Sequence, residues 1–233
     1  MKYVFLLLII ICISFRQSFS QLPCHYGIYA GYGYSYYNIN PDFEDVVDYL
    51  PQSNFSIGAI SGINLKSNVF LEVGLHYYKD GYSIKYSWNV MDPNDPAIPE
   101  RTNFQASYLQ MPLITGYIFH PLKKISFSPN LGLNLRYILT SNEESQFMDG
   151  SMRKSDFMLR DIKNLNTGIK FGVRVGYEAS PKIVFGLEPY IIKNLTRIDQ
   201  LFLESGQFSL GISFILTLKH NLINQSSKCH WHS

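Results

Sequence analysis

The chain has 233 residues, of which 15% are aromatic and only 16% are charged, with a formal net charge of +2. Soluble domains usually carry about 25% charged residues, so this composition argues against an ordinary cytosolic enzyme. The small net charge gives no reason to expect nucleic acid as a partner.

The first 20 residues predict a cleaved secretory signal peptide. Lys2 precedes an apolar run over residues 4–15, and the small residues Ser18 and Ser20 precede Gln21. The apolar run is shorter than the roughly 20 residues of a membrane-spanning helix, which disfavours the alternative of an N-terminal anchor. No later apolar run approaches that length.

Eight amphipathic segments follow, in which apolar and polar side chains alternate with the period of a β-strand. The alternation is clearest from Gln207 to Leu218, where Ile215 alone interrupts the polar set. A bilayer is crossed by ~9–11 residues of tilted strand, which each segment supplies. The predicted strands cover residues 26–37, 54–65, 69–78 with an extension toward 88, 104–119, 125–139, 165–178, 183–192 and 207–218.

The connections between these segments alternate in length. Short ones cover 66–68, 120–124 and 180–182, and long ones cover 38–53, 79–103, 140–164 and 196–206. Outer-membrane barrels have an even number of antiparallel strands, short periplasmic turns and long extracellular loops. The sequence therefore predicts an all-β fold, an eight-stranded antiparallel transmembrane β-barrel over residues 21–218. It would lie in outer-membrane lipid, with residues 219–233 as a periplasmic C-terminal tail.

Three prolines lie inside predicted strands, at Pro112, Pro129 and Pro189. Proline cannot donate to the hydrogen-bond ladder, and a closed barrel has no edge on which to place it. We therefore expect a β-bulge or local bend at each.

The segment Tyr108-Leu109-Gln110-Met111-Pro112-Leu113 resembles the Tyr-Leu-x-x-Pro-Leu strand of the PorT-like outer-membrane β-barrel family of Bacteroidota. Residues 75–82 are similar to the aromatic strand of that family, and residues 129–133 to its Pro-x-x-Gly strand. The resemblance implies the fold and the outer-membrane location. It implies little about activity, because only some members serve protein secretion.

Polar side chains gather on the predicted inward face of the strands. We read them as an ion network that fills the barrel, because an eight-stranded interior is just wide enough for side chains. The alternative is a polar conduit or proton relay. The residues concerned are Glu72, His76, Gln110, Arg136, Lys170, Arg174, Glu178 and Glu188.

No catalytic, cofactor or metal site is expected. Ser151 and Lys154 match a Ser-x-x-Lys pattern, but its partner motifs are missing. His76 is better explained as a hydrogen-bonded interior histidine than as a catalytic base. The mature chain keeps Cys24 and Cys229, one near each end, which predicts a disulfide between them in an oxidising compartment.

The long loops are the place where binding is expected. Their aromatic residues Phe43, Tyr49, Phe147 and Phe157 are candidate contacts for an unidentified protein or extracellular ligand. The sequence thus favours a non-enzymatic barrel with a filled interior that acts structurally or by binding. A narrow channel or secretion-associated component is the second interpretation, and a lipid-modifying barrel enzyme the third.

Overall fold

The computed structural model describes residues 24–37, 47–65, 68–86, 99–156, 165–196 and 207–220. Ten β-strands occupy most of these ranges. No helix within them is long and apolar enough to cross a membrane. The expected signal peptide lies outside the described residues, and so does the expected tail beyond His220.

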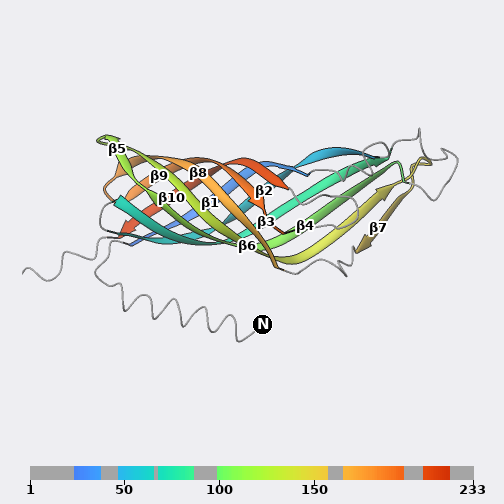
Figure 1. The fold of residues 1–233 in the computed structure, drawn as a ribbon, viewed down its shortest axis with the longest axis horizontal. Coiled ribbons are helices and arrows are strands. Elements are labelled where there is room, and N and C mark those ends of the chain that lie inside the picture. Colours follow the sequence, from blue (N-terminus) through green and yellow to red (C-terminus); the bar gives the residue numbers. More distant parts are fainter. Residues whose placement is uncertain are drawn as a thin grey trace, which may run out of the picture.

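Eight of the strands close into an antiparallel barrel (Figure 1). Each pairs with its neighbour along the chain, while β1 also pairs with β10, and β4 pairs with β6. The predicted fold class is therefore confirmed. The barrel strands are β1 (Cys24–Tyr36), β2 (Val47–Asn64), β3 (Val69–Tyr86), β4 (Arg101–Tyr117), β6 (Ile125–Gln146), β8 (Leu165–Ser180), β9 (Ile183–Asn194) and β10 (Phe208–His220).

Two short strands were not predicted. β5 (Phe119–Leu122) pairs with the start of β6, in the turn between β4 and β6. β7 (Met152–Asp156) pairs antiparallel with the end of β6 and adds one short strand to the sheet there. The short connections 66–68, 120–124 and 180–182 mark one end of the barrel, called here the turn end; the opposite end is the loop end.

Several strands run much further than their sequence patterns predicted. β2 begins at Val47 and β6 reaches Gln146, both inside segments expected to be loops, while β3 reaches Tyr86, within the extension toward residue 88 that was expected for it. β1 ends at Tyr36 and β9 at Asn194, so one side of the barrel is longer than the other. Figure 1 shows the long side projecting from the loop end. This extension consists of residues 47–53, 79–86, 101–107, 138–146 and 152–156.

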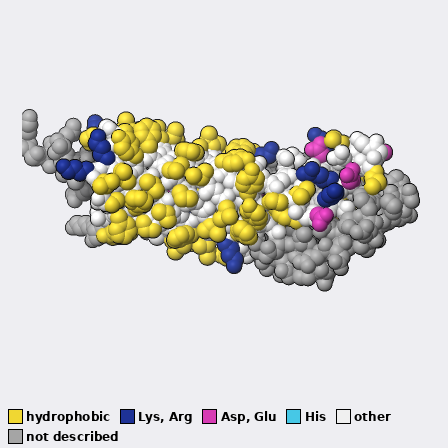
Figure 2. Space-filling model, turned by 90° about the horizontal axis from the view of Figure 1, so that it is seen from above, with side chains coloured by type: hydrophobic (Ala, Val, Ile, Leu, Met, Phe, Trp, Pro, Cys, Tyr) yellow, Lys and Arg dark blue, Asp and Glu magenta, His cyan; other side chains and the backbone are white. Residues whose placement is uncertain are grey.

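The two faces of the strands have opposite chemistry. Outward side chains such as Ile28, Leu131 and Phe214 are apolar and more than half exposed. Figure 2 shows hydrophobic side chains spread over the face of the barrel that is in view, with Lys and Arg toward its ends. Such a band suits lipid, because a charged side chain at mid-membrane depth costs ~2–4 kcal/mol.

The register is unchanged at Pro112, Pro129 and Pro189, so the expectation of a β-bulge there was wrong, while the alternative of a local bend stays a prediction. Pro129 pairs with Val173 in a register that continues unchanged on both sides. At Pro112 the β3–β4 ladder loses bonds but resumes in the same register, because proline removes a donor while keeping an extended backbone. Register shifts occur at Pro51/Phe55 and Ser107/Tyr108, where the extension leaves the barrel, and at Phe119/Leu122 and Glu178/Ser180 at the turn end.

Candidate functional site

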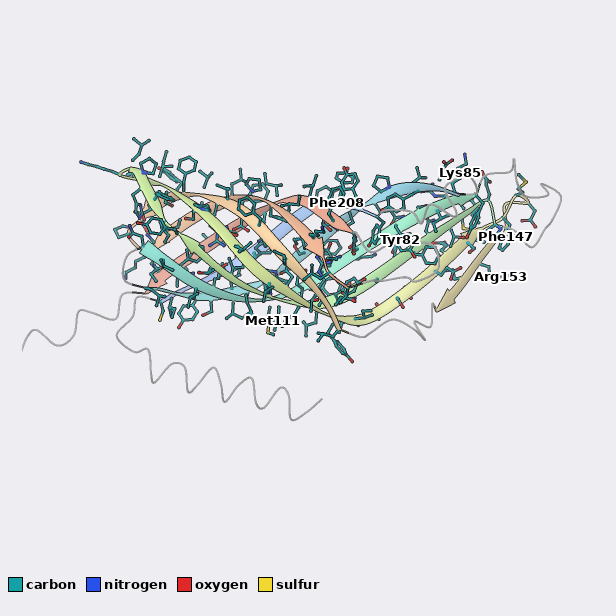
Figure 3. The ribbon with its side chains drawn as sticks, viewed as in Figure 1. Tyr82, Lys85, Met111, Phe147, Arg153 and Phe208 are labelled. Carbon is teal, nitrogen blue, oxygen red and sulfur yellow. The ribbon has the colours of Figure 1, made fainter. Side chains whose placement is uncertain are left out.

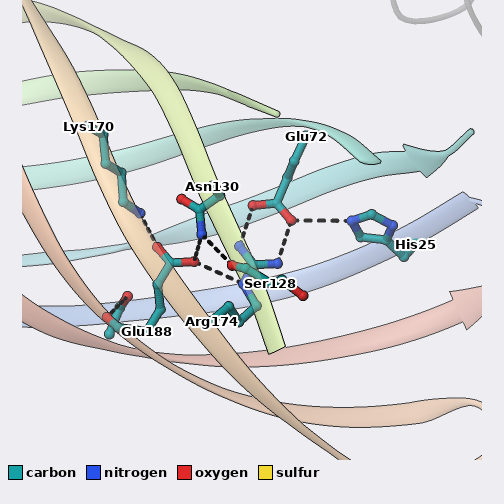
Figure 4. Close-up of polar contacts among 8 residues, drawn as sticks. His25, Glu72, Ser128, Asn130, Lys170, Arg174 and Glu188 are labelled. Carbon is teal, nitrogen blue, oxygen red and sulfur yellow. Dashed lines mark hydrogen bonds and ion pairs between the residues drawn. The ribbon is translucent and has the colours of Figure 1, made fainter. Parts of the chain in front are cut away.

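The interior of the barrel holds a buried cluster of ion pairs (Figure 4). Arg174 on β8 donates through both terminal nitrogens to Glu72 on β3, with N···O distances of 2.8 and 2.9 Å. Its Nε donates to Glu188 on β9 at 2.9 Å, and the ammonium group of Lys170 binds the other oxygen of Glu188. Period-two alternation sends all four side chains inward from three strands, so the charges meet near the barrel axis.

Two further residues complete this ion cluster. The Nε2 atom of His25 lies 3.2 Å from Glu72 Oε2, and Asn130 Nδ2 donates to Glu188 Oε2 at 3.3 Å. Glu188 is fully buried and Glu72 is 5% exposed. Because a buried charge without a partner is strongly destabilising, this mutual pairing is what allows the charges to remain inside.

A second polar cluster lies nearer the loop end, around Asp80. The carboxylate accepts hydrogen bonds from the hydroxyls of Tyr37 and Tyr78, from Gln207 Nε2 and from the backbone N–H of Gly81. The positive charge near this carboxylate comes from Arg136. Its guanidinium lies 4.2 Å from the ring centre of Tyr78, whose hydroxyl binds Asp80.

The predicted interior residues divide into four groups. Glu72, Lys170, Arg174 and Glu188 meet in the ion cluster, and Gln110 binds Arg136 at 3.0 Å nearer the loop end. The expectation of a hydrogen-bonded His76 was wrong: its ring stacks on Tyr29 with ring centres 4.2 Å apart, and neither ring nitrogen has a hydrogen-bond partner among the described residues. Glu178 stays apart at the turn end, where it pairs with Lys219.

Sequence reasoning missed Asp80 and His25 as interior residues. Asp80 falls both in the long connection 79–103 and in the expected extension of the third strand, and it was not named as an interior residue, although it continues the inward alternation of Glu72, His76 and Tyr78 along β3. His25 comes two residues before the inward Gly27 of β1, just ahead of the expected strand. Carrying the period-two pattern past the predicted strand ends would have found both.

Aromatic rings pack at the base of the extension. Tyr82 stacks on Phe104 at 4.6 Å and lies 4.9 Å from Tyr37, which also contacts Tyr49. The Tyr49 hydroxyl donates to the carbonyl of Ser35 at 3.0 Å. Burial, with the nearby Asp80 carboxylate, raises the pKa of Tyr49 well above its usual value.

The remaining candidate residues are only partly described. Phe147 lies at the turn between β6 and β7, with the guanidinium of Arg153 5.3 Å from its ring centre. Tyr82, Lys85, Phe147 and Arg153 all lie in the extension or at its tip (Figure 3). Cys24 begins β1, while Cys229, Phe43 and Phe157 fall outside the described residues.

Comparisons with known proteins give a consistent assignment. The family described as outer membrane protein beta-barrel domain matches residues 15–200. No curated protein matches the chain. Similar solved structures include Neisserial surface protein A (13% identity, TM-score 0.45, covering 84% of this chain and 97% of that one). They also include OprG from Pseudomonas aeruginosa (11% identity, TM-score 0.43, covering 86% of this chain and 98% of that one). A third is a major outer membrane protein from Thermus thermophilus (9% identity, TM-score 0.46, covering 84% of this chain and 99% of that one). Because the family model covers residues 15–200, the chain belongs to the family of outer-membrane proteins with a β-barrel domain, and its location is the outer membrane.

Proposed function

We propose that this protein is a non-enzymatic binding protein of the outer membrane, in which the barrel is the anchor and the extension is the contact surface. The extension carries the proposal, because it lengthens one side of the barrel only. Short turns of outer-membrane barrels face the periplasm, which would place the extension outside the cell. The proposed partner is an extracellular protein or ligand.

The chemistry of the extension supports a contact role. Leu50, Met148 and Met152 are 38%, 54% and 64% exposed there. Lys154 and Glu144 form an exposed ion pair at 3.3 Å between β7 and β6. Apolar side chains among charges of both signs, on a rigid sheet, are typical of a surface that binds with little ordering cost.

The filled interior favours an anchor over the alternative of a narrow channel. The ion cluster joins β3, β8 and β9 across the barrel, and ions could pass only if these pairs separated. A non-enzymatic role is also supported by the ion cluster, in which Glu72, Glu188, Lys170 and Arg174 bind one another. We further propose membership of the PorT-like group of Bacteroidota, on the strength of the Tyr108–Leu113 motif.

The binding role can be tested by site-specific crosslinking on intact cells of the native host. A photoreactive amino acid would replace Met152 in the extension or, as a matched control, Leu122 at the turn end, which is 62% exposed. We expect discrete crosslinked products from position 152 that are absent from position 122. Equal products from both positions, or none from position 152, would contradict the proposal.

A further inference from the structure

Two chains of hydrogen bonds in the loop-end half of the barrel interior run toward each other and stop at opposite sides of Gly168. The first starts at Arg136 Nε, which donates to Gln110 Oε1 at 3.0 Å. Gln110 Nε2 then donates to Asn134 Oδ1 at 3.3 Å. The amide nitrogen of Asn134 has no hydrogen-bond partner among the described residues, although Asn134 is fully buried.

The second chain ends at Asp80. Gln207 Nε2 donates to Asp80 Oδ2 at 2.7 Å, and Asn194 Nδ2 donates to Gln207 Oε1. The carbonyl oxygen of Asn194 has no partner within the described ranges, and the residue is 5% exposed. A free donor thus ends one chain and a free acceptor ends the other.

The charged residue at the end of each hydrogen-bond chain fixes the orientation of the side-chain amides in that chain. A guanidinium can only donate hydrogen bonds, so Gln110 must present its oxygen to Arg136 and its nitrogen to Asn134. A carboxylate can only accept, so Gln207 must present its nitrogen to Asp80 and its oxygen to Asn194. The free atoms therefore follow from the fixed chemistry of Arg136 and Asp80, and do not depend on an arbitrary choice of amide flip.

The two free atoms flank one small residue. Asn134 on β6 is the direct neighbour of Gly168 on β8, which in turn is the direct neighbour of Asn194 on β9. The free oxygen of Asn194 lies 2.9 Å from the place where a Cβ atom of residue 168 would stand. Asn134 and Asn194 are two strand spacings apart, about 10 Å between Cα atoms, which is too far for a direct bond between extended strands but short enough for a bridging molecule.

A third buried donor belongs to the same place. Asn166 lies two residues before Gly168 on the same face of β8, is 1% exposed, and its nitrogen Nδ2 has no partner in the described part of the chain. Its oxygen accepts a bond from the hydroxyl of Thr196 at 3.1 Å. Buried waters typically make about three hydrogen bonds to polar groups that otherwise lack a partner.

We propose that the interior binds an ordered water molecule over Gly168, which accepts from Asn134 Nδ2 and Asn166 Nδ2 and donates to Asn194 Oδ1. The water joins the two chains into one path in which every bond runs from Arg136 toward Asp80. Because the Arg136 guanidinium packs on the ring of Tyr78, whose hydroxyl binds Asp80, the path closes into a polar ring inside the barrel.

Water itself is the probe in the test. The full chain, labelled with ¹⁵N and placed in lipid nanodiscs, is examined for nuclear Overhauser effects between water and side-chain amide protons. We expect cross peaks at the amides of Asn134 and Asn166, and none at Gln110, whose nitrogen already binds Asn134. No cross peak at Asn134, or an equally strong one at Gln110, would overturn the proposal.

A pair of glycine variants locates the site. In Gly168→Ala the new Cβ stands 2.9 Å from Asn194 Oδ1, where the water is proposed to bind, and we expect the Asn134 cross peak to be lost. In Gly172→Ala, on the same face of the same strand, the new Cβ meets Asn130 Oδ1 at 3.1 Å, and the cross peak should remain. Retention of the peak in Gly168→Ala would contradict the site. Should either variant fail to fold, the wild-type measurement decides alone.

Discussion

Arg174 and Glu72 lie 102 residues apart in the chain and form a two-pronged ion pair across the barrel, with N···O distances of 2.8 and 2.9 Å. The pair links β8 to β3, which are not neighbours in the sheet. It therefore ties together opposite walls of the barrel.

Replacing Glu72 by leucine should destabilise the barrel by about 3–5 kcal/mol, because Arg174 then stays buried with one partner fewer. The double variant with Arg174→Met should recover part of this loss, since it removes the stranded charge. Urea unfolding in lipid vesicles measures both. The exposed pair Lys154–Glu144 is the matched control, where Glu144→Ala should change stability by at most ~1 kcal/mol. Similar losses at the two sites would contradict a stabilising role for the interior pair.

A charge on the outward face should have an effect that depends on depth. Phe171 and Leu165 point outward from β8 and are 51% and 52% exposed. Phe171→Arg, in the middle of the strand, should cost ~2–4 kcal/mol, while Leu165→Arg at the loop end should cost ~0–1 kcal/mol. The yield of folded, heat-modifiable barrel on gels reports the difference. Equal yields would mean that β8 does not cross the bilayer as described.

The purified protein should show no steady ion conductance in a planar bilayer. Lys170 and Glu188 are 2% and 0% exposed and bind each other in the ion cluster, so the axis is filled at that level. Reproducible single-channel steps, with an ion selectivity that changes in Lys170→Glu, would instead support the channel interpretation.

Cys24 and Cys229 are expected to form a disulfide. Cys24 pairs with His220 where β1 meets β10, so the chain leaves the barrel beside Cys24, nine positions before Cys229. Oxidising compartments favour such pairing. Mass spectrometry of non-reduced peptides should find the crosslinked pair, and its loss in Cys24→Ser. Free thiols at both positions in the wild-type protein would refute this prediction.

The turn at the tip of the extension should respond to acid. The hydroxyl and the backbone N–H of Ser151 bind Asp149, and both lower the pKa of this carboxyl below its usual value. A lowered folded pKa means that the added stability of the turn is complete above the ordinary pKa of aspartate and is lost as pH falls through the lowered one. An NMR titration of Asp149 should show the lowered midpoint, and Ser151→Gly should move it back toward the ordinary value. An unchanged midpoint would disprove the contact.

The sequence predicted well which side chains of each strand face outward. The face in contact with lipid is uniformly apolar, and because side chains alternate along a strand, the residues between the apolar ones must point inward. Glu72, Gln110 and Lys170 were expected inside and are at most 5% exposed. Which interior side chains form ion pairs with one another was harder to predict. That Arg174 meets Glu72 and not Glu178 depends on the stagger between strands, which no single segment encodes.

Apart from the continuation of the third strand toward residue 88, the extension was missed because its strands lack the membrane pattern. Residues 140–146 are polar on both faces, since neither face meets lipid, and their alternation carries no apolar signal. β7 is likewise a run of mostly polar residues that becomes a strand only by pairing with β6.

The pairing of β1 with β10 joins the first and last strands of the barrel, so the cylinder can close only after the whole barrel sequence has been synthesised. A chain that stopped before Phe208 would hold β1 and β9 as open edges in hydrocarbon, where each unpaired backbone group costs several kcal/mol. A single hairpin containing β8 and β9 would carry Lys170, Arg174 and Glu188 without the opposite wall that holds Glu72. Stepwise insertion of hairpins is therefore unfavourable, and the barrel must cross the membrane as a nearly complete unit.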